Sequence, residues 1–133
     1  MAIKDDEARE AYFEMQAIEQ QMRQLSQQIS LIENQIQDFQ NSIEAVSSLK
    51  SKTGEEIFVP VCSGVYAKAE LRNDDKFIVN VGANVAVEKT GESAMEIIRK
   101  QIGDMGIYKD QMVRGMELLE ARAKEIQKRV LEN

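Results

Sequence analysis

Residues 15–46 read MQAIEQQMRQLSQQISLIENQIQDFQNSIEAV, and this stretch decides the fold. Its apolar side chains recur at alternating intervals of three and four residues, and the same spacing extends back to Ala8. The positions of this first stripe are Ala8, Ala11, Met15, Ile18, Met22, Leu25, Ile29, Ile32, Ile36, Phe39, Ile43 and Val46. A 3.5-residue period over this many heptads predicts a left-handed coiled coil, because it keeps one narrow stripe against a partner helix.

A second stripe with the same spacing predicts the partner helix. It runs through Met95, Ile98, Ile102, Met105, Met112, Met116, Leu119, Ala123, Ile126 and Val130, with Lys109 in its one polar position. At 1.5 Å per residue the two stripes are about 57 and 53 Å long, so the helices can pair almost fully. Basic residues near the end of the second helix can face the acidic start of the first, which favours an antiparallel hairpin. Both chain ends then meet at one tip.

The segment between the stripes, Glu56 to Lys89, is rich in Val, Ile, Tyr and Phe and is interrupted by turn residues. The predicted turns are Ser63-Gly64, Asn73-Asp74-Asp75 and Gly82-Ala83-Asn84. The predicted strands are residues 57–62, 65–71, 76–81 and 85–89, which form two hairpins. Because a lone hairpin is marginal in water, these strands are expected to pair with other subunits, and Pro60 suits an edge strand.

Capping residues mark the predicted helix ends. Asp5 and Asp6 can cap the first helix and Gly54 can follow its last turn, while Thr90 and Ser93 are alternative caps for the second. We therefore predict a single domain over residues 1–133. It comprises a helix at 5–53, two hairpins within 56–89 and a helix at 91–131.

Composition argues against several classes of function. The net charge of −6 offers no support for a surface that binds nucleic acid, and the absence of histidine removes the commonest general base and metal ligand. No stretch reaches the ~20 apolar residues of a membrane span, and the acidic N-terminus does not read as a signal peptide. We expect a cytoplasmic protein without catalytic residues, cofactor or metal, in which Cys62 is a small buried hydrophobe rather than a reactive thiol.

Three short motifs in the middle segment resemble the α-type, or five-like, subunits of the prefoldin family. They are VPVCSG at 59–64, YAKAEL at 66–71 and IVNVGANVAVEKT at 78–90. The family characteristically has Val-Pro-Val/Leu-Gly-x-Gly and then Val-Gly-x-Gly/Asn-x-x-Val/Ile-Glu-Lys. Cys62 departs from this pattern at a usual glycine, which affects the expected turn geometry. The resemblance covers nearly the whole chain.

The resemblance implies an α+β fold in which the strands of two α-type and four β-type subunits form an intersubunit β-barrel. Such heterohexamers hold unfolded polypeptides at the tips of their coiled coils without ATP and deliver them to a group II chaperonin. The residues expected to carry assembly are Phe58, Val59, Val61, Val65, Tyr66, Phe77, Ile78, Val79, Val81, Val85 and Val87.

Apolar residues near the two chain ends are candidates for binding the client. Tyr12, Phe13, Leu118 and Leu131 fall outside the stripes and are expected to be exposed together at the tip, although scattered surface residues are an alternative interpretation. The stripe residues Met15, Leu119, Ile126 and Val130 complete the predicted client-binding set. Methionines in the stripes can be ordinary seam residues, or they can let the coil repack around varied clients.

Two other functional hypotheses stay open on the sequence alone. The chain could be a structural coiled-coil adaptor that assembles through the same strands without holding clients, and an enzyme would need a concave pocket that an extended hairpin lacks. Gly103, Gly106 and Gly115 weaken the second helix near Lys109 and are interpreted as a hinge or as tolerated substitutions.

Overall fold

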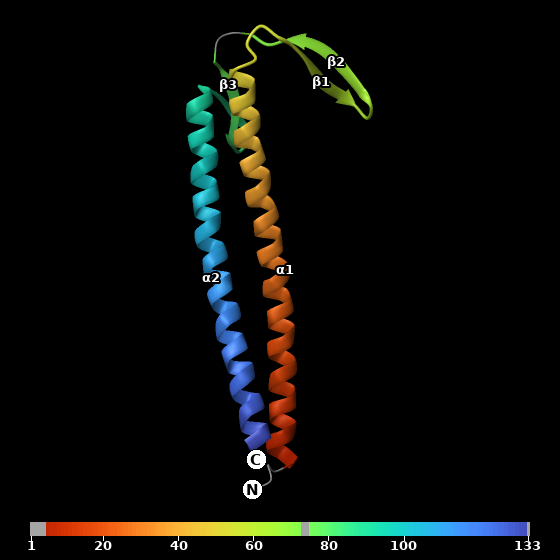
Figure 1. Ribbon diagram of the computed structural model, residues 1–133, viewed down its shortest axis with the longest axis vertical. Coiled ribbons are helices and arrows are strands. Elements are labelled where there is room, and N and C mark those ends of the chain that lie inside the picture. The colour runs from red at the N-terminus through yellow and green to blue at the C-terminus, as the bar shows by residue number, and fades with distance from the viewer. Residues whose placement is uncertain (1–4, 73–74, 133) are drawn as a thin grey trace. The chain divides into compact units, whose positions relative to one another are not determined.

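The computed structural model describes residues 5–72 and 75–132, which form two long helices with two β-hairpins between them (Figure 1). The elements in chain order are α1 (Asp5–Lys50), β1 (Glu56–Cys62), β2 (Val65–Glu70), β3 (Phe77–Gly82), β4 (Val85–Lys89) and α2 (Gly91–Glu132). The chain divides into two compact units. The helix-pair unit contains α1 up to Ile36 together with α2 from Asp104, and the hairpin unit is Gln37–Gly103. The predicted α+β fold class is confirmed, whereas the single domain and the intersubunit barrel stay predictions.

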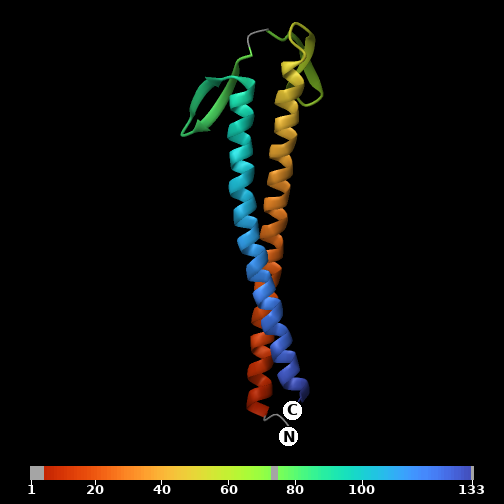
Figure 2. The same cartoon turned by 60° about the vertical axis from the view of Figure 1, so that its left-hand side comes forward.

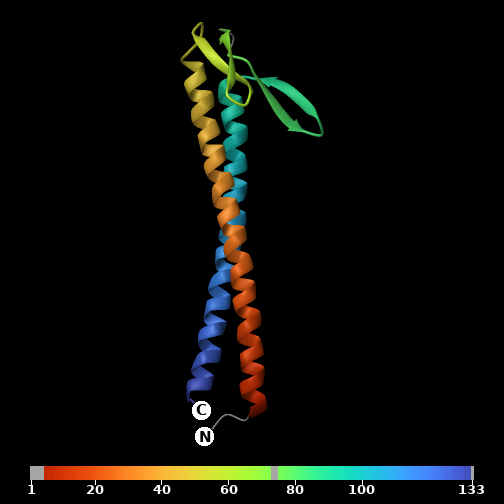
Figure 3. The same ribbon diagram turned by 90° about the vertical axis from the view of Figure 1, so that its right-hand side faces the viewer.

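The helix-pair unit is an antiparallel pair. The contacting residues of α2 descend as those of α1 ascend, from Glu14 with Arg122, through Leu25 beside Gly115, to Glu33 with Lys109. The start of α1 and the end of α2 therefore lie at the same end of this unit, and Figure 1, Figure 2 and Figure 3 all show the two helix segments side by side. We call this end, residues 5–15 with 118–131, the tip.

The predicted stripes are the sheltered faces of the helices. Every residue of the first stripe is buried or half-buried, and so is every residue of the second except Val130. Ala11, Ile18 and Ile126 form the buried core of the helix-pair unit, and Met15, Met22, Leu119 and Ala123 pack against it. Val130 departs from the pattern because it lies in the last turns of α2, where α1 covers it only in part. Lys109 keeps its stripe position by pairing its Nζ with Glu33 Oε1 at 3.2 Å.

The end of α1 differs from the prediction. The helix stops at Lys50 rather than at residue 53, because the chain tightens there into hydrogen bonds three residues apart. The N–H of Ser51 donates to the carbonyl of Ser48 and the N–H of Lys52 donates to that of Leu49. Gly54 has φ +82°, as the predicted left-handed stop requires, but it stands four residues beyond the helix.

Both hairpins are antiparallel and two-stranded, with β1 paired to β2 and β3 paired to β4. Each is seen as its own ribbon in Figure 2 and Figure 3. The first turn uses Gly64 at φ +76°. In the second turn both central residues, Ala83 at +51° and Asn84 at +60°, are left-handed, which is the geometry of a type I′ hairpin. The sequence predicts a turn at this place but does not indicate that Ala83 takes a left-handed conformation.

The structure decides between the two predicted caps of α2. Thr90 Oγ1 accepts a hydrogen bond from the N–H of Ser93 at 3.1 Å, so Thr90 is the cap and Ser93 lies within the first turn. The helix then continues without a break through Gly103, Gly106 and Gly115. A hinge at these glycines stays a prediction.

The expectation of a buried Cys62 is wrong, because its thiol is exposed. Cys62 is the last residue of β1, where it pairs with Val65, and neither face of this two-stranded sheet is covered at that point. Its main chain does not take a positive φ, unlike that of Gly82, which holds the same place in the second hairpin. The turn therefore does not require glycine at position 62.

Candidate functional site

The tip carries an open apolar groove of about 530 Å³. Its lining comes from both helices and consists of Ala8, Ala11, Tyr12, Met15, Ile126, Gln127, Val130 and Leu131. The groove lies in the first turns of α1 and the last turns of α2, where Val130 and Leu131 are only partly covered by α1. A concave apolar surface with one polar side chain can accept an apolar group by removing it from water.

The structure brings most of the predicted client-binding residues to this groove, but not all of them. Tyr12, Met15, Ile126, Val130 and Leu131 line it. The remaining three, Phe13, Leu118 and Leu119, do not. The exposed members of the set are Tyr12 and Phe13 at 59% each, Leu118 at 73%, Leu131 at 84% and Val130 at 37%.

Burial separates two roles within the same predicted set. Ile126 is 0% exposed and belongs to the core of the helix pair, so it can touch a client only if the helices separate. Met15 and Leu119 are half-buried and pack against that core. The accessible surface of the groove is therefore supplied mainly by Tyr12 and Leu131, with Val130 beside them.

The ring of Tyr12 is held in place by its neighbours on α1. It meets the ring of Phe13 edge-on with 5.8 Å between centroids, and its hydroxyl accepts a hydrogen bond from Gln16 Nε2 at 2.8 Å. An ordered ring loses less conformational freedom on binding than a mobile one. Tyr12 is thus a suitable anchor for an apolar ligand.

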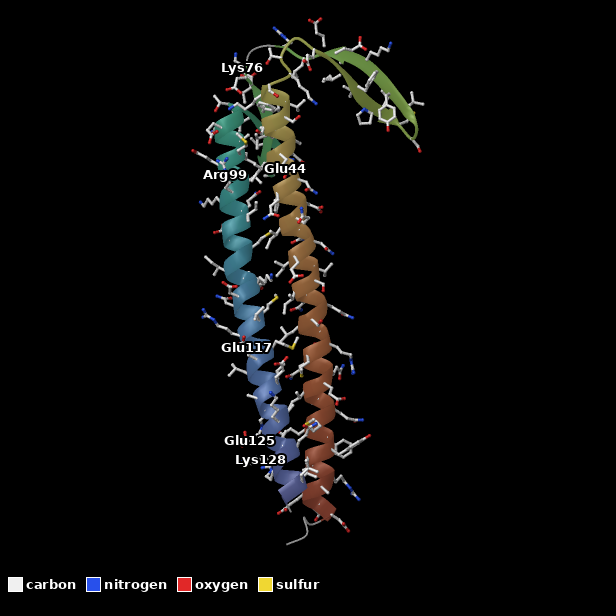
Figure 4. The ribbon with its side chains drawn as sticks, viewed as in Figure 1. Glu44, Lys76, Arg99, Glu117, Glu125 and Lys128 are labelled. Atoms are coloured by element: carbon white, nitrogen blue, oxygen red, sulfur yellow. The ribbon has the colours of Figure 1, made fainter. Side chains whose placement is uncertain are left out.

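A charged cluster joins the helices on another side of the tip. Arg122 donates from Nε and Nη2 to the same Glu14 oxygen, Oε1, at 2.8 and 2.7 Å, and from Nη1 to Glu125 Oε2 at 3.2 Å. The hydrogen bond to Glu14, and then that to Glu125, raises the pKa of Arg122 above its ordinary value. This cross-helix pair has the antiparallel orientation expected from the charges. Figure 4 marks Glu125 together with Glu117 and Lys128 along α2.

The predicted assembly residues form the surface of the two hairpins. Eight of them are exposed: Phe58, Val59, Val61, Val65, Tyr66, Ile78, Val81 and Val85. Phe77, Val79 and Val87 are half-buried, and Val79 lies directly opposite Val87 in the ladder. So many exposed β-branched and aromatic side chains on narrow two-stranded sheets are a surface suited to contact with other strands.

Some exposed apolar residues were missed in the sequence. Leu31, Ile107 and Tyr108 of the helix-pair unit are each more than half exposed, and they fall outside the stripes just as Tyr12 and Phe13 do. The groove also contains Ala8 and Ala11, which the stripe predicts as seam residues, and Gln127, for which the sequence predicts no role. Their position was the available signal, because Ala8 opens the first stripe and Gln127 follows Ile126 near the end of the second.

The described residues also bear on two other kinds of site. No group of three or more His, Cys, Asp or Glu side chains in residues 5–72 and 75–132 is arranged to hold a metal ion. Neither of the described helices has the length and apolar character needed to cross a membrane.

Comparison with known proteins gives one consistent result. The profile of the prefoldin family, described as prefoldin subunit, matches residues 18–132. Prefoldin subunit alpha of Methanosarcina acetivorans is 31% identical over 138 residues, covering 96% of this chain and 97% of that protein. The matches to prefoldin subunit alpha of Thermofilum pendens (33% identical over 86 residues) and of Methanothrix thermoacetophila (44% over 59 residues) cover 65% and 44% of this chain. In these two the chain spans 65% and 39% of the relative's length.

A solved structure agrees with the fold. The cryo-EM structure of filamentous PFD from Methanocaldococcus jannaschii is similar with a TM-score of 0.79, covering 89% of this chain and 98% of that one. The sequence identity is 23%, so this likeness concerns the fold alone.

Proposed function

The chain belongs to the prefoldin family, and we propose that it is an α-type subunit of an ATP-independent chaperone that binds unfolded polypeptides at its coiled-coil tip. Family membership supports a chaperone-subunit role in general. The observation that carries the finer proposal is the open apolar groove at the tip, with Tyr12 and Leu131 exposed along it. Unfolded chains differ from folded ones in exposing apolar side chains, and this surface can shelter them.

The seam beneath the groove suits a ligand that varies in size. Its core is small, and Met15 and Met22 pack beside it. Methionine has three rotatable bonds and a polarisable sulfur, so such a seam can repack around different side chains at low cost. One groove can then accept segments of many different clients, and no ATP-driven step is needed for binding.

The second part of the proposal concerns assembly. The expected complex contains two α-type and four β-type subunits, joined through the exposed side chains of the hairpins. An isolated two-stranded hairpin leaves the outer edge of each strand without a ladder partner, and other subunits can supply strands there. Several tips on one complex would hold a client more firmly than one tip, by raising the effective concentration of the remaining sites. Delivery of the client to a group II chaperonin completes the proposed function.

The test is aggregation suppression by reconstituted complexes in which only this chain is altered. The double variant Tyr12→Ser/Leu131→Ser removes two exposed groove residues, and Ile107→Ser/Leu118→Ser removes two similarly exposed residues outside the groove. Burying one such side chain contributes about 1.5–3 kcal/mol. Because β-type tips also contribute, we expect the groove variant to require roughly two- to tenfold more complex for the same protection. The matched variant should differ little from the parent.

The outcomes separate the remaining hypotheses. Full protection by a complex that carries all four serines would show that these tips do not hold the client. Failure of the unaltered complex to slow aggregation would favour a structural adaptor. The tip belongs to a different unit from the strands, so tip variants are expected to assemble normally. Native mass spectrometry should confirm in every case that the altered complexes are intact before protection is compared.

A further inference from the structure

Three elements of the hairpin unit meet at Gly91, the first residue of α2. The N–H of Gly91 donates to Asp75 Oδ1 at 3.1 Å, and Gly91 is buried. A Cβ at this position would lie 2.6 Å from Cδ of Lys50, the last residue of α1, and 2.9 Å from Asp75 Oδ1. Any larger residue here would displace the side chains of Lys50 and Asp75, so glycine favours the contact by leaving room for it rather than by its backbone conformation.

The contact between Asp75 and Gly91 lies where the β3–β4 ladder would have a further residue pair. Phe77 pairs with Lys89, so two residues farther out on each strand the same register brings Asp75 opposite Gly91. Asp75 has φ +47°, which takes its main chain out of the extended conformation. Its side-chain carboxylate supplies the hydrogen-bond acceptor there, and this closes the open end of the hairpin. Lys76, which lies between Asp75 and the start of β3, is labelled in Figure 4 and shows where this end of the hairpin is.

The connection between the β3–β4 hairpin and α2 is very short. A single residue, Thr90, joins the last residue of β4 to the first of α2. Beside the junction is a hollow of about 530 Å³, whose lining includes Leu49, Lys50, Leu71, Asp75 and Phe77. Apolar packing therefore does not fill this place. The bond from Gly91 to Asp75 ties the β3 side of the hairpin to the first turn of α2, in addition to the covalent connection through Thr90.

We propose that Asp75, through its hydrogen bond to Gly91, is a positioning residue that sets the direction in which the β3–β4 hairpin leaves α2 for assembly. The inference rests on the proposed role of the hairpins as the assembly surface. A hairpin attached at two points pays less conformational entropy when it joins other strands than one that swings on Thr90. The helices themselves do not depend on this bond, because Thr90 still caps α2.

The first test compares Asp75→Ala with Asp75→Asn in the full chain, with and without a co-expressed β-type subunit. Alanine removes the acceptor, whereas the asparagine amide oxygen can accept the same bond and tolerates positive φ. Native mass spectrometry over a dilution series should show that Asp75→Ala needs about tenfold more protein for half-assembly. Asp75→Asn should assemble close to the parent, and circular dichroism should give both variants the helical signal of the parent.

A second pair of variants approaches the contact from the other side. Gly91→Ala places a Cβ against Asp75 and Lys50 and should produce the same assembly defect. Gly103→Ala is the matched control, because a Cβ there meets no atom within 4 Å. It should assemble like the parent.

The results distinguish this inference from the proposed function. Assembly of Asp75→Ala at the parental concentration overturns the positioning role, and so does an equal defect in Asp75→Asn. Loss of the helical signal in Asp75→Ala also overturns it, since the bond would then hold the fold. If aspartates placed within β3 itself leave assembly intact, the strands are not the assembly surface, and it is the proposed function that fails.

Discussion

Replacing Val79 and Val81 by aspartate is expected to leave the chain helical but unable to form higher oligomers. Val79 is half-buried opposite Val87, and Val81 is exposed. If other strands cover these side chains in the complex, each aspartate puts an unpaired charge into an apolar interface, at a cost of several kcal/mol. The helices do not contain these residues. Native mass spectrometry should therefore show dissociated chains, while circular dichroism keeps its helical signal.

A control with the same added charge makes this result specific. Gln20→Glu with Gln27→Glu adds two negative charges at exposed positions of α1 and changes neither side-chain size nor helix propensity. This variant should assemble like the parent. A full-sized complex formed by the double-aspartate chain would contradict assembly through β3.

The helices were predictable because their signal is repeated many times. Each stripe residue carries little information alone. A three-four spacing sustained from Ala8 to Val46, however, fits only a helix with one buried face. Burial follows that pattern along both helices. The strands were predictable for a related reason, since β-branched runs between glycine-containing turns leave few alternatives.

The details that escaped prediction depend on single contacts between distant residues or on local geometry. The end of α1 at Lys50 follows from hydrogen bonds three residues apart, which no propensity distinguishes from one more helical turn. Cys62 is exposed because no described residue covers β1 at that point. The residue pattern of a strand predicts the strand but not whether another layer covers it. The contact of Asp75 with Gly91 joins residues sixteen positions apart in the chain.

The tip was predictable in position but not in detail. Off-stripe spacing identified Tyr12, Phe13, Leu118 and Leu131 as exposed, and all four are. Which of them share a groove depends on the rotation of each helix about its axis near its end. Tyr12 and Leu131 face the groove while Phe13 and Leu118 do not. The stripe separates Tyr12, which directly follows the seam residue Ala11, from Phe13, but it does not separate Leu131 from Leu118, since each is next to a stripe residue. Their role in binding clients stays a prediction.

The second large effect is expected at Ile126, the most buried side chain of the described helix pair. It is 0% exposed and packs with Ala11 and Ile18. Truncation to alanine should cost roughly 2–5 kcal/mol in the free energy of unfolding, near the lower end because the core is small and can partly collapse. Ile126→Asp should cost more, because its carboxylate takes the place of a side chain that is 0% exposed and must lose its hydration or become protonated.

Hydrogen exchange measured separately over residues 5–36 and 104–132 is the appropriate readout, since it reports opening of the helix pair itself. Ile126→Asp should remove most amide protection there. Leu118→Asp is the matched control, because this leucine lies on the same helix with 73% of its surface exposed, and the change should alter stability by about 0.5 kcal/mol or less. Equal loss of protection in the two variants would mean that α2 does not bury the face that contains Ile126. Protection lost only in Ile126→Asp would establish that the two helices hold the tip closed through this side chain.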